Sequence, residues 1–414
     1  MADSLPTGTA AVQPRNHQPI RVCLVSAAYH PYPSGVSEHV HNLAESLHRL
    51  GLHVHVLTTN YHGARFLPSS PCSGFPVTRL GQARLVPMNR SFATVPVGLR
   101  LAAQVKRFFA EHRFDVVHCH GMFWPEISYW AIRYSDAVHV VTFLTAGFKL
   151  RTWGSRLFRR LFRQHLARIH GLVPISNRAW QAFQSYVPGK PRIIPSGVDL
   201  ARFRPGLPPL PEKDPGRPTI LFLGRLDSRK GLTVLLRSMP MVIKSVPGAR
   251  LVVVGTGPRL AEAKRICHQL GLGQSVIFQG AVTRDDLPRY YCGCDVYCSP
   301  ALGGETLGIV LLEAMASGVP VVASDIPGYD ETIENSKTGL LVPPDDPAAL
   351  ATALTRVLTD PGLRSRLATA GLARVRQYAW PIVARKTVEY YLELLNRHSG
   401  PAASGPDSDY GMSG

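Results

Sequence analysis

The sequence predicts an α/β protein of two doubly wound, Rossmann-like domains that face each other across a cleft. Three observations lead to this prediction. Short apolar runs alternate with stretches of helical periodicity, the alternation occurs in two successive sets, and a proline-rich stretch at residues 206–217 separates the sets. A length of 414 residues also favours two or three domains over one. Ligands of such sheets bind beyond the carboxyl ends of the strands, so the loops there are the candidates for function.

The first set opens with a buried strand, a loop and a helix. Residues 20–29 are mostly apolar, and apolar side chains recur at helical spacing over residues 36–50, after which Gly51 ends the helix. Residues 53–59 read as the next strand, which completes a β-loop-α-β unit with a glycine in its first turn. Residues 61–97 are rich in Pro, Gly and Arg and allow no assignment. The remaining elements expected in this set are helices at 98–111 and 153–170 and strands at 114–121, 139–144 and 171–176.

The second set repeats the same pattern after the proline-rich stretch. Strands are expected at 219–224, 250–255, 275–280, 295–300 and 320–324. Helices are expected at 232–244 and 308–318, and another helix is expected to end at about residue 270. Two further helices are expected at the end of the fold. From this pattern we divide the chain into a flexible tail (1–19), a first domain (20–205), a linker (206–217), a second domain (218–380), a C-terminal helix that packs back on the first domain (381–398) and a disordered tail (399–414).

Composition indicates a globular, cytoplasmic protein. The apolar content of 45% is ordinary, and no run approaches the roughly 20 apolar residues that a membrane span needs. Residues 1–19 contain no apolar core flanked by positive charge, so we expect no secretory signal. Seven cysteines in a chain of this size do not resemble a disulfide framework, which suggests a reducing compartment.

The positive charge is concentrated in the first half of the chain. Residues 1–200 hold 22 Lys and Arg against 8 Asp and Glu, whereas residues 201–414 hold 24 against 20. A general basic bias of the proteome would explain the net charge of +18, and so would an anionic membrane surface, an anionic acceptor or nucleic acid. We expect no nucleic-acid partner, because no recognition fold or strand face with basic and aromatic residues is present.

The segment GGETLGIVLLEAMASGVPVVASD, residues 303–325, carries the clearest candidate for a binding site. A helix that opens near Gly308 presents unpaired amides and a positive dipole end there, which suits a phosphate or diphosphate. Glu313 lies on the face of Ile309, about 6 Å further along the axis, and Glu305 lies in the preceding loop. Carboxylates around an anion-binding helix end suit a nucleotide sugar. The alternative is a buried helix with a capping glutamate, but an unpaired charge within this apolar run would be costly.

Several segments together resemble the family 4 retaining glycosyltransferases, which have the GT-B fold of two facing Rossmann-like domains. ETLGIVLLE matches the E-x7-E signature of that family, and GRLDSRKG is similar to its G-R-x4-K-G loop. The resemblance continues through PSGVSEHV, DVVHCHG, VVVGTGP, FQGAVTRDDL and TGLLVPPDDP, and it covers roughly residues 20–398. It implies a nucleotide-sugar donor on the second domain, an acceptor on the first and retention of anomeric configuration.

The resemblance also implies roles for individual residues. Arg225 and Lys230 match the pair that binds the donor diphosphate, where two fixed cations would stabilise the charge on the leaving group; without the resemblance they would read as solvated surface charges. His120 matches the active-site histidine in contact with the transferred sugar, although a structural histidine is the alternative, and His118 is left as support. The catalytic set is therefore His120, Arg225, Lys230 and Glu305, and the donor-binding set is Gly35, Arg225, Lys230, Val282, Glu305, Leu307, Gly308, Ile309 and Glu313.

We expect no metal ion or other cofactor. Cys292, Cys294 and Cys298 lie close together but lack a second pair of ligands at matching spacing. A D-x-D motif could hold a divalent cation, but Asp407 and Asp409 form such a motif only in the C-terminal tail. No other D-x-D motif is present in the sequence. Transfer without a metal agrees with the GT-B resemblance.

A basic helix is the candidate for acceptor or membrane contact. In residues 153–170 two rows of aromatic and leucine side chains alternate with Arg156, Arg159, Arg160 and Arg163. Such a helix can lie in a membrane interface, or it can pack on its own sheet with a solvated basic face. The positive first half fits an acceptor in an anionic leaflet, and peripheral association with the inner face of the plasma membrane follows from that reading.

The most specific expectation is an enzyme like the phosphatidylinositol mannosyltransferases, with GDP-mannose as donor. A UDP-sugar-dependent transferase with another lipid or a soluble acceptor stays open. An epimerase of GT-B fold and a non-catalytic lipid-binding module are the alternatives from other classes. The sequence does not determine the base, the sugar, the acceptor, the linkage or the oligomeric state.

Overall fold

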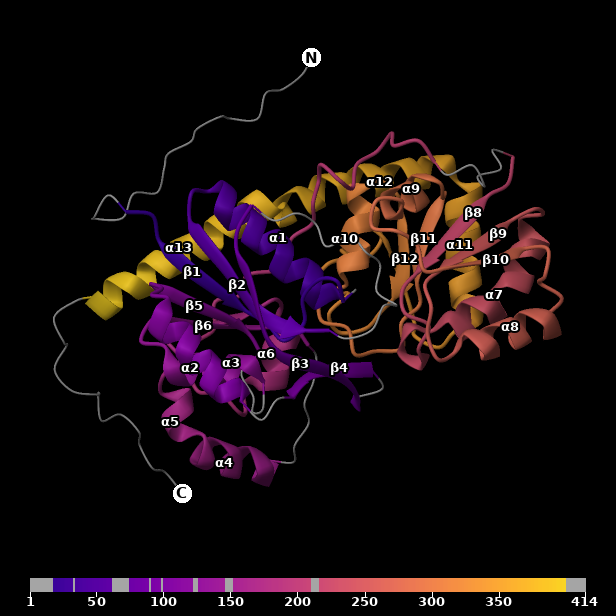
Figure 1. Cartoon of the computed structure of the whole chain (residues 1–414). Coiled ribbons are helices and arrows are strands. Elements are labelled where there is room, and N and C mark those ends of the chain that lie inside the picture. The colour runs from indigo at the N-terminus through magenta and orange to yellow at the C-terminus, as the bar shows by residue number, and fades with distance from the viewer. Residues whose placement is uncertain are drawn as a thin grey trace, which may run out of the picture.

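The computed structural model describes residues 18–32, 34–61, 74–88, 91–97, 100–121, 126–145, 152–209 and 216–399. It contains two α/β lobes, each with helices on both faces of a sheet, as Figure 1 shows. The predicted fold class is thereby confirmed. The predicted tails at residues 1–17 and 400–414 and the linker residues 210–215 lie outside the described residues.

The first lobe is built on a seven-stranded sheet in the order β4-β3-β2-β1-β5-β6-β7. Its neighbouring strands run parallel except for the antiparallel pair β3 and β4. The strands are β1 (Arg21–Val25), β2 (His53–Asn60), β3 (Val77–Met88), β4 (Ser91–Val97), β5 (Val116–His120), β6 (Val138–Phe143) and β7 (Gly171–Pro174). The helices are α1 (Gly35–Arg49), α2 (Leu101–Glu111), α3 (Ile127–Tyr134), α4 (Thr152–Leu161), α5 (Arg163–Leu166) and α6 (Asn177–Phe183).

The second lobe is built on a six-stranded parallel sheet in the order β10-β9-β8-β11-β12-β13. Its strands are β8 (Thr219–Leu223), β9 (Arg250–Val254), β10 (Val276–Gly280), β11 (Val296–Ser299), β12 (Val321–Ser324) and β13 (Leu340–Val342). Its helices are α7 (Leu232–Ser245), α8 (Leu260–Gln269), α9 (Leu287–Cys292), α10 (Ile309–Ala316), α11 (Pro347–Thr359) and α12 (Pro361–Val375), and α13 (Trp380–Ser399) follows. The 3₁₀ turns are η1 (Ser228–Lys230) and η2 (Arg376–Tyr378).

Burial of the strands on both faces explains their nearly continuous apolar sequences. In the first lobe α1 and α13 cover one face of the sheet and α2 and α3 cover the other. In the second lobe α7, α8 and α11 cover one face, and α9 and α10 cover the other. Parallel sheets of this kind need helical crossovers, which is why strand and helix alternate along the chain.

Three predicted segments differ from the structure. Residues 77–97, which allowed no assignment, form the antiparallel hairpin β3–β4 at the edge of the first sheet. The predicted basic helix at 153–170 is broken at Phe162 into α4 and α5. Three helices rather than two follow β13, because Asp360 ends α11 and its side chain caps α12 by accepting from the Leu363 amide at 2.8 Å.

The C-terminal helix α13 connects the two lobes. The chain leaves α12 in the second lobe, pairs briefly with the first lobe at the Val198–Ala379 bridge, and then runs along the first lobe (Figure 1). Trp380 and Tyr391 of α13 lie in the same apolar core as β1 and α1. Two chain crossings, this one and the segment that precedes β8, therefore join the lobes.

Candidate active site between the two lobes

The start of α10 is shaped by a glycine that no other residue could replace without strain. Gly308 has φ 71° and ψ 65°, in the left-handed region. A Cβ atom at this position would lie 2.6 Å from the buried ring of Tyr329 and 2.8 Å from Leu311 Cδ1. The close packing lets Tyr329 and Leu311 fill the space beneath the helix start, and it leaves the first turn of α10 with backbone amides that have no partner within the helix.

A second helix begins beside the first. Gly35 is the first residue of α1, and a Cβ there would lie 3.7 Å from the side chain of Ile309, the first residue of α10. Ser34 caps α1 by accepting from the Ser37 amide at 3.0 Å. Its backbone is extended, so a serine is unstrained there. Two positive helix ends from different lobes therefore meet at one place, which suits an anion.

Lys230 and Glu305 form an ion pair at the carboxyl edge of the second sheet. Lys230 Nζ lies 2.9 Å from Glu305 Oε1, and their side chains are only 18% and 12% exposed. The loop that carries Lys230 is held close by Gly231, whose hypothetical Cβ would lie 1.8 Å from the Pro300 carbonyl oxygen after β11. Arg225 follows β8 in the same loop and is half-buried.

Glu313 lies one turn into α10 and is half-buried. The Tyr291 hydroxyl donates to Glu313 Oε2 at 2.9 Å. Burial raises the pKa of Glu313 to about 7, against the opposing effects of the Arg202 charge and the Tyr291 hydrogen bond. A carboxyl group with this pKa can accept hydrogen bonds from ligand hydroxyls at neutral pH, and its burial makes an unpaired state costly.

Leu307 and Val282, the remaining predicted donor-binding residues, expose little of their side chains. Leu307 is 2% exposed, and its carbonyl accepts from the Thr332 hydroxyl at 2.5 Å, so its amide is the group left for a ligand. Val282, in the loop after β10, is partly buried and packs on the apolar core shared with α10.

His120 ends β5 in the opposite lobe and is buried. Among the described residues no group meets strict hydrogen-bond geometry with either ring nitrogen, although the Val25 backbone interacts with the ring. Its ring lies 5.2 Å from that of His39 and is stacked 4.7 Å from that of His118. Burial lowers the pKa of His120 to about 4, with a smaller opposing effect from the Val25 backbone, so the imidazole is neutral at pH 7.

His118 is oriented by hydrogen bonds on both of its ring nitrogens. Nδ1 lies 2.6 Å from the hydroxyl of Tyr391 on α13, and Nε2 lies 2.6 Å from Thr142 Oγ1. The supporting role predicted for His118 agrees with these contacts, although the partner on α13 was not visible in the sequence.

Sequence reasoning missed the charged residues that line the boundary between the lobes. Glu38 of α1 lies near Arg202 and Arg284, with Arg284 Nε 3.3 Å from Glu38 Oε1 and Arg202 Nη1 3.6 Å from Oε2. They are far apart along the chain and match no spacing rule, so only the fold brings them together. The nearby sequence signal was the position of Glu38 in the first turn of a helix.

In the basic segment at residues 153–170 the apolar side chains do not all lie on one buried face. Arg156, Arg159, Arg160 and Arg163 are exposed, as predicted. The rings of Phe158 and Phe162 stack with their centroids 4.5 Å apart, and both side chains pack against the core that α2 and α3 form with the first sheet. In contrast, Leu157 and Leu161 are 42% and 70% exposed. Leucine and arginine therefore share the outer surface, and the side chain of Trp153 lies outside the described part.

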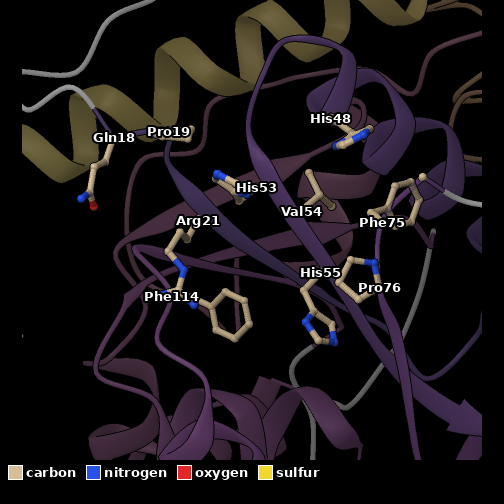
Figure 2. Close-up of a pocket in the computed structure, with 11 residues that line it drawn as sticks. Gln18, Pro19, Arg21, His48, His53, Val54, His55, Phe75, Pro76 and Phe114 are labelled. Carbon is tan, nitrogen blue, oxygen red and sulfur yellow. The ribbon is translucent and has the colours of Figure 1, made fainter.

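A cavity in the first lobe lies away from this site. A cavity of about 540 Å³ lies at the amino ends of β1 and β2, at the sheet edge opposite His120, and Figure 2 shows its lining, which includes Arg21, His48, His53, Phe75 and Phe114. Strands of a doubly wound sheet carry their ligands at the other edge, so this cavity is not part of the donor site.

Metal-ligating side chains do not gather into a group of three or more within the part of the chain that the structure describes. Cys298 is buried in β11, while Cys292 and Cys294 lie at the end of α9. In the same described residues no helix has the length and apolar character required to cross a bilayer.

The fold and the site define a class of protein. Two facing Rossmann-like lobes, with paired cations, carboxylates and two helix starts between them, are the arrangement of a nucleotide-sugar glycosyltransferase of GT-B fold. Two family models match the chain, "Glycosyltransferase Family 4" over residues 33–202 and "Glycosyl transferases group 1" over residues 208–374.

Curated relatives and a solved structure give the particular family. The chain is 35% identical over 378 residues to a phosphatidyl-myo-inositol mannosyltransferase of Mycobacterium leprae, which covers 90% of this chain and 96% of the relative. It is 36% identical over 209 residues to a GDP-mannose-dependent alpha-(1-6)-phosphatidylinositol monomannoside mannosyltransferase of Mycobacterium tuberculosis, covering 48% of this chain and 54% of that one. The solved sucrose-phosphate synthase of Thermosynechococcus elongatus superposes with a TM-score of 0.71 at 25% identity, covering 91% of this chain and 100% of that chain. The protein belongs to the family 4 glycosyltransferases, and the predicted resemblance is confirmed.

Proposed function

We propose that this glycosyltransferase moves mannose from GDP-mannose to phosphatidylinositol or a closely related inositol lipid. The observation that carries the proposal is identity of 35% through both lobes to a phosphatidyl-myo-inositol mannosyltransferase, so that donor and acceptor sides are both included. The relative named as GDP-mannose-dependent supports the choice of donor. Retention of configuration and independence of metal ions are part of the proposal and come from the family.

The donor diphosphate lies, in this proposal, between the first residues of α10 and α1, beside Arg225 and Lys230. Two helix ends and two cations would stabilise the negative charge that grows on the leaving diphosphate. Glu313 and Glu305 would accept hydrogen bonds from donor hydroxyls on either side. Lys230 must then share its charge between Glu305, 2.9 Å away, and the diphosphate.

Transfer would proceed from the front face of the sugar. The acceptor oxygen bonds to the anomeric carbon while the bond from that carbon to the phosphate oxygen breaks, and the acceptor proton passes to the departing phosphate. Neutral His120, buried on the acceptor side, would contact the sugar by hydrogen bonding rather than by charge. Closure of the two lobes would exclude water and so limit donor hydrolysis.

The acceptor side carries the features expected for a lipid surface. The exposed Arg156, Arg159, Arg160 and Arg163 lie on the outer face of α4 and α5 together with exposed Leu157 and Leu161. Arginine attracts anionic headgroups and leucine enters the interface, so we propose peripheral association with the inner face of the plasma membrane in the cytoplasm.

An assay with separate donor and acceptor arms tests the proposal. The full chain is incubated with labelled GDP-mannose and vesicles containing phosphatidylinositol, and the lipid fraction is separated by chromatography. Labelled lipid is the expected result. Matched arms with UDP-glucose, with UDP-N-acetylglucosamine and with free inositol identify a different donor or a soluble acceptor. Conversion of the donor to an isomer without acceptor would instead show an epimerase and would refute the proposal.

Removal of one cation at the proposed diphosphate site should slow transfer. Arg225→Ala is expected to lower kcat by about 10²–10³-fold, because charge on the leaving group loses a fixed partner. Arg237→Ala, an exposed arginine on α7, is the control for a generic loss of charge. Unfolding midpoints of both variants should stay near that of the parent, and full activity of Arg225→Ala would exclude the role assigned to it.

A further inference from the structure

The boundary between the lobes contains two carboxylates that reach across it, one from each side. Glu38 belongs to the first turn of α1 in the first lobe. Glu331 lies between β12 and β13 in the second lobe. Neither belongs to the donor-binding set described above, and each contacts groups that belong to the opposite lobe.

Glu38 is held by an arginine of the loop after β10. Arg284 Nε donates to Glu38 Oε1 at 3.3 Å, and its Nη2 donates to Oε2 at 3.4 Å. Arg202 completes the cluster, because its Nη2 donates to the Arg284 carbonyl at 2.6 Å. Burial alone would raise the pKa of Glu38, but the charges of Arg284 and Arg202 outweigh it and hold that pKa below its ordinary value. Glu38 is therefore an ionised partner for Arg284 at neutral pH.

The positions of these two residues place the ion pair near the proposed donor site. Arg284 lies two residues after Val282, and Glu38 lies three residues after Gly35. Both Val282 and Gly35 are proposed donor-binding positions, one in each lobe. The pair therefore joins the first turn of α1 to the loop after β10.

Glu331 closes the start of a helix in the other lobe. Its Oε2 accepts from the Asn177 amide at 2.8 Å and from the Asn177 side chain at 3.1 Å, and its Oε1 accepts from the Arg178 amide at 2.8 Å. The Ser176 side chain accepts from the Ala179 amide at 3.1 Å. Glu331 thus accepts from the amides of Asn177 and Arg178, the first two residues of α6, whereas the Ser176 cap reaches only the amide of Ala179.

The segment that carries Glu331 is itself fixed within the second lobe. Arg374 of α12 donates to the Glu331 carbonyl at 2.9 Å and to the Thr332 carbonyl at 2.6 Å. A further contact across the boundary joins the Thr306 hydroxyl, which donates, to the Leu144 carbonyl at 3.1 Å. Because the Glu331 backbone is anchored, movement of the lobes would break its contacts with α6 rather than bend the segment.

We propose that Glu38 and Glu331 are positioning residues that hold the two lobes together around the proposed donor site, Glu38 through Arg284 and Glu331 through the first amides of α6. The lobes are joined by two chain crossings, so such contacts decide their relative position. The inference rests on the proposed function for the meaning of that site, but the contacts themselves do not depend on the identity of the donor.

Hydrogen exchange on the free, full-length chain tests the structural part without any activity. Glu331→Gln replaces one acceptor oxygen by an amide that repels the helix N–H groups, so exchange of the amides at Asn177 and Arg178 should rise at least fivefold.

Glu38→Gln should enlarge the radius of gyration in solution scattering, and addition of GDP should reduce it again. Glu45→Gln and Glu262→Gln are matched controls, since these carboxylates pair with Arg49 and Arg259 within a single lobe. Unchanged exchange in Glu331→Gln and unchanged scattering in Glu38→Gln would overturn the proposal.

Kinetics test the consequence for the reaction. A loosened closure admits water, so both variants should show a higher ratio of donor hydrolysis to transfer, whereas the controls should keep the parent ratio. Arg284→Met should match Glu38→Gln, and the double variant should be no worse than either single one, because both remove the same pair. Additive losses would overturn the pairing. If the parent chain fails to transfer mannose while the exchange and scattering results hold, the proposed function fails and the positioning role stands.

Discussion

At the scale of single residues, the site depends on conformations and pKa values that the neighbours impose. Gly308 is required by two separate constraints, a left-handed backbone and the ring of Tyr329 against its α-carbon. Glu313 is kept near its protonation midpoint at pH 7 by burial. The glycine and the glutamate were recognisable in the sequence, but the ring of Tyr329 against Gly308 and the burial that raises the pKa of Glu313 come from the fold.

Substitution of the glycine at the start of α10 should cost stability and ligand binding together. Gly308→Ala adds left-handed strain and a clash with a buried ring, and we expect the free energy of unfolding to fall by at least about 2 kcal/mol. Gly51→Ala separates the two effects, since Gly51 has φ 87° but open space around its α-carbon. Its loss should be only about 1 kcal/mol. Equal losses in urea unfolding of the two variants would contradict the role of the clash.

The buried glutamate should make stability depend on pH in a defined direction. The pKa of Glu313 is raised from 4.5 to about 7 in the folded chain, so the folded state binds this proton more tightly than the unfolded state. The contribution is complete below about pH 4.5 and is lost as the pH rises through about 7. Glu313→Gln removes the titrating group, so stability is no longer lost there as the pH rises, and its amide oxygen can still accept from the Tyr291 hydroxyl. From pH 5 to pH 8 the variant should therefore gain on the order of 2–3 kcal/mol relative to the parent. Parallel pH profiles in urea unfolding would contradict this assignment.

At the scale of elements, the segments that departed from prediction are those in which local patterning conflicts with packing. The β3–β4 hairpin contains Pro87 and Pro96 and little regular alternation, yet the edge of a sheet tolerates proline. In the basic segment the stacked Phe158 and Phe162 face the first core, and the chain leaves helical geometry at Phe162. Both features depend on the neighbouring sheet, which no window of the sequence contains.

The outer face of α4 and α5 should determine membrane binding. Replacement of Arg156, Arg159, Arg160 and Arg163 by Gln is expected to weaken binding to vesicles with anionic lipid by more than about 100-fold, at roughly 1 kcal/mol per residue. The matched control replaces four exposed basic residues of the second lobe, Arg237, Lys244, Arg265 and Arg366. Sedimentation across a salt series measures both. Equal binding of the two variants, or binding indifferent to lipid charge, would refute the role of this face.

At the scale of the whole molecule, the last helix completes the first lobe. Trp380, Val383, Tyr391 and Leu394 of α13 belong to the core built on β1 and α1. Tyr391 also orients His118, which stacks on the proposed catalytic His120. The last helix thus supports the histidines that the first lobe contributes to the proposed site.

Removal of α13 should therefore disrupt the first lobe selectively. A chain that ends at residue 379 loses the apolar side chains that cover one face of the first sheet, whereas the core formed by α7, α8 and α11 is untouched. Limited proteolysis with mass spectrometry should find a resistant fragment from the second lobe alone. A resistant first lobe in the truncated chain would show that α13 is dispensable for its fold.

Much of the fold was predictable because parallel strands and crossover helices leave strong periodic signals. The proposed donor segment stood out in the sequence for a related reason: glycine before a helix and a carboxylate within an apolar run are locally unusual. Glu38 with Arg284, and Glu331 with α6, were not predictable, because separations of 246 and 154 residues leave no local trace. The positions of these partners follow from how two independently folded sheets dock.

By itself, the sequence determined the class of fold and the family and proposed residues for a nucleotide sugar, since each leaves a short-range pattern. Only the tertiary structure decided that two helix starts meet, that Lys230 pairs with Glu305, and that α13 returns to orient His118. Those outcomes depend on packing between segments distant in the chain, where burial sets the distances and the electrostatics together.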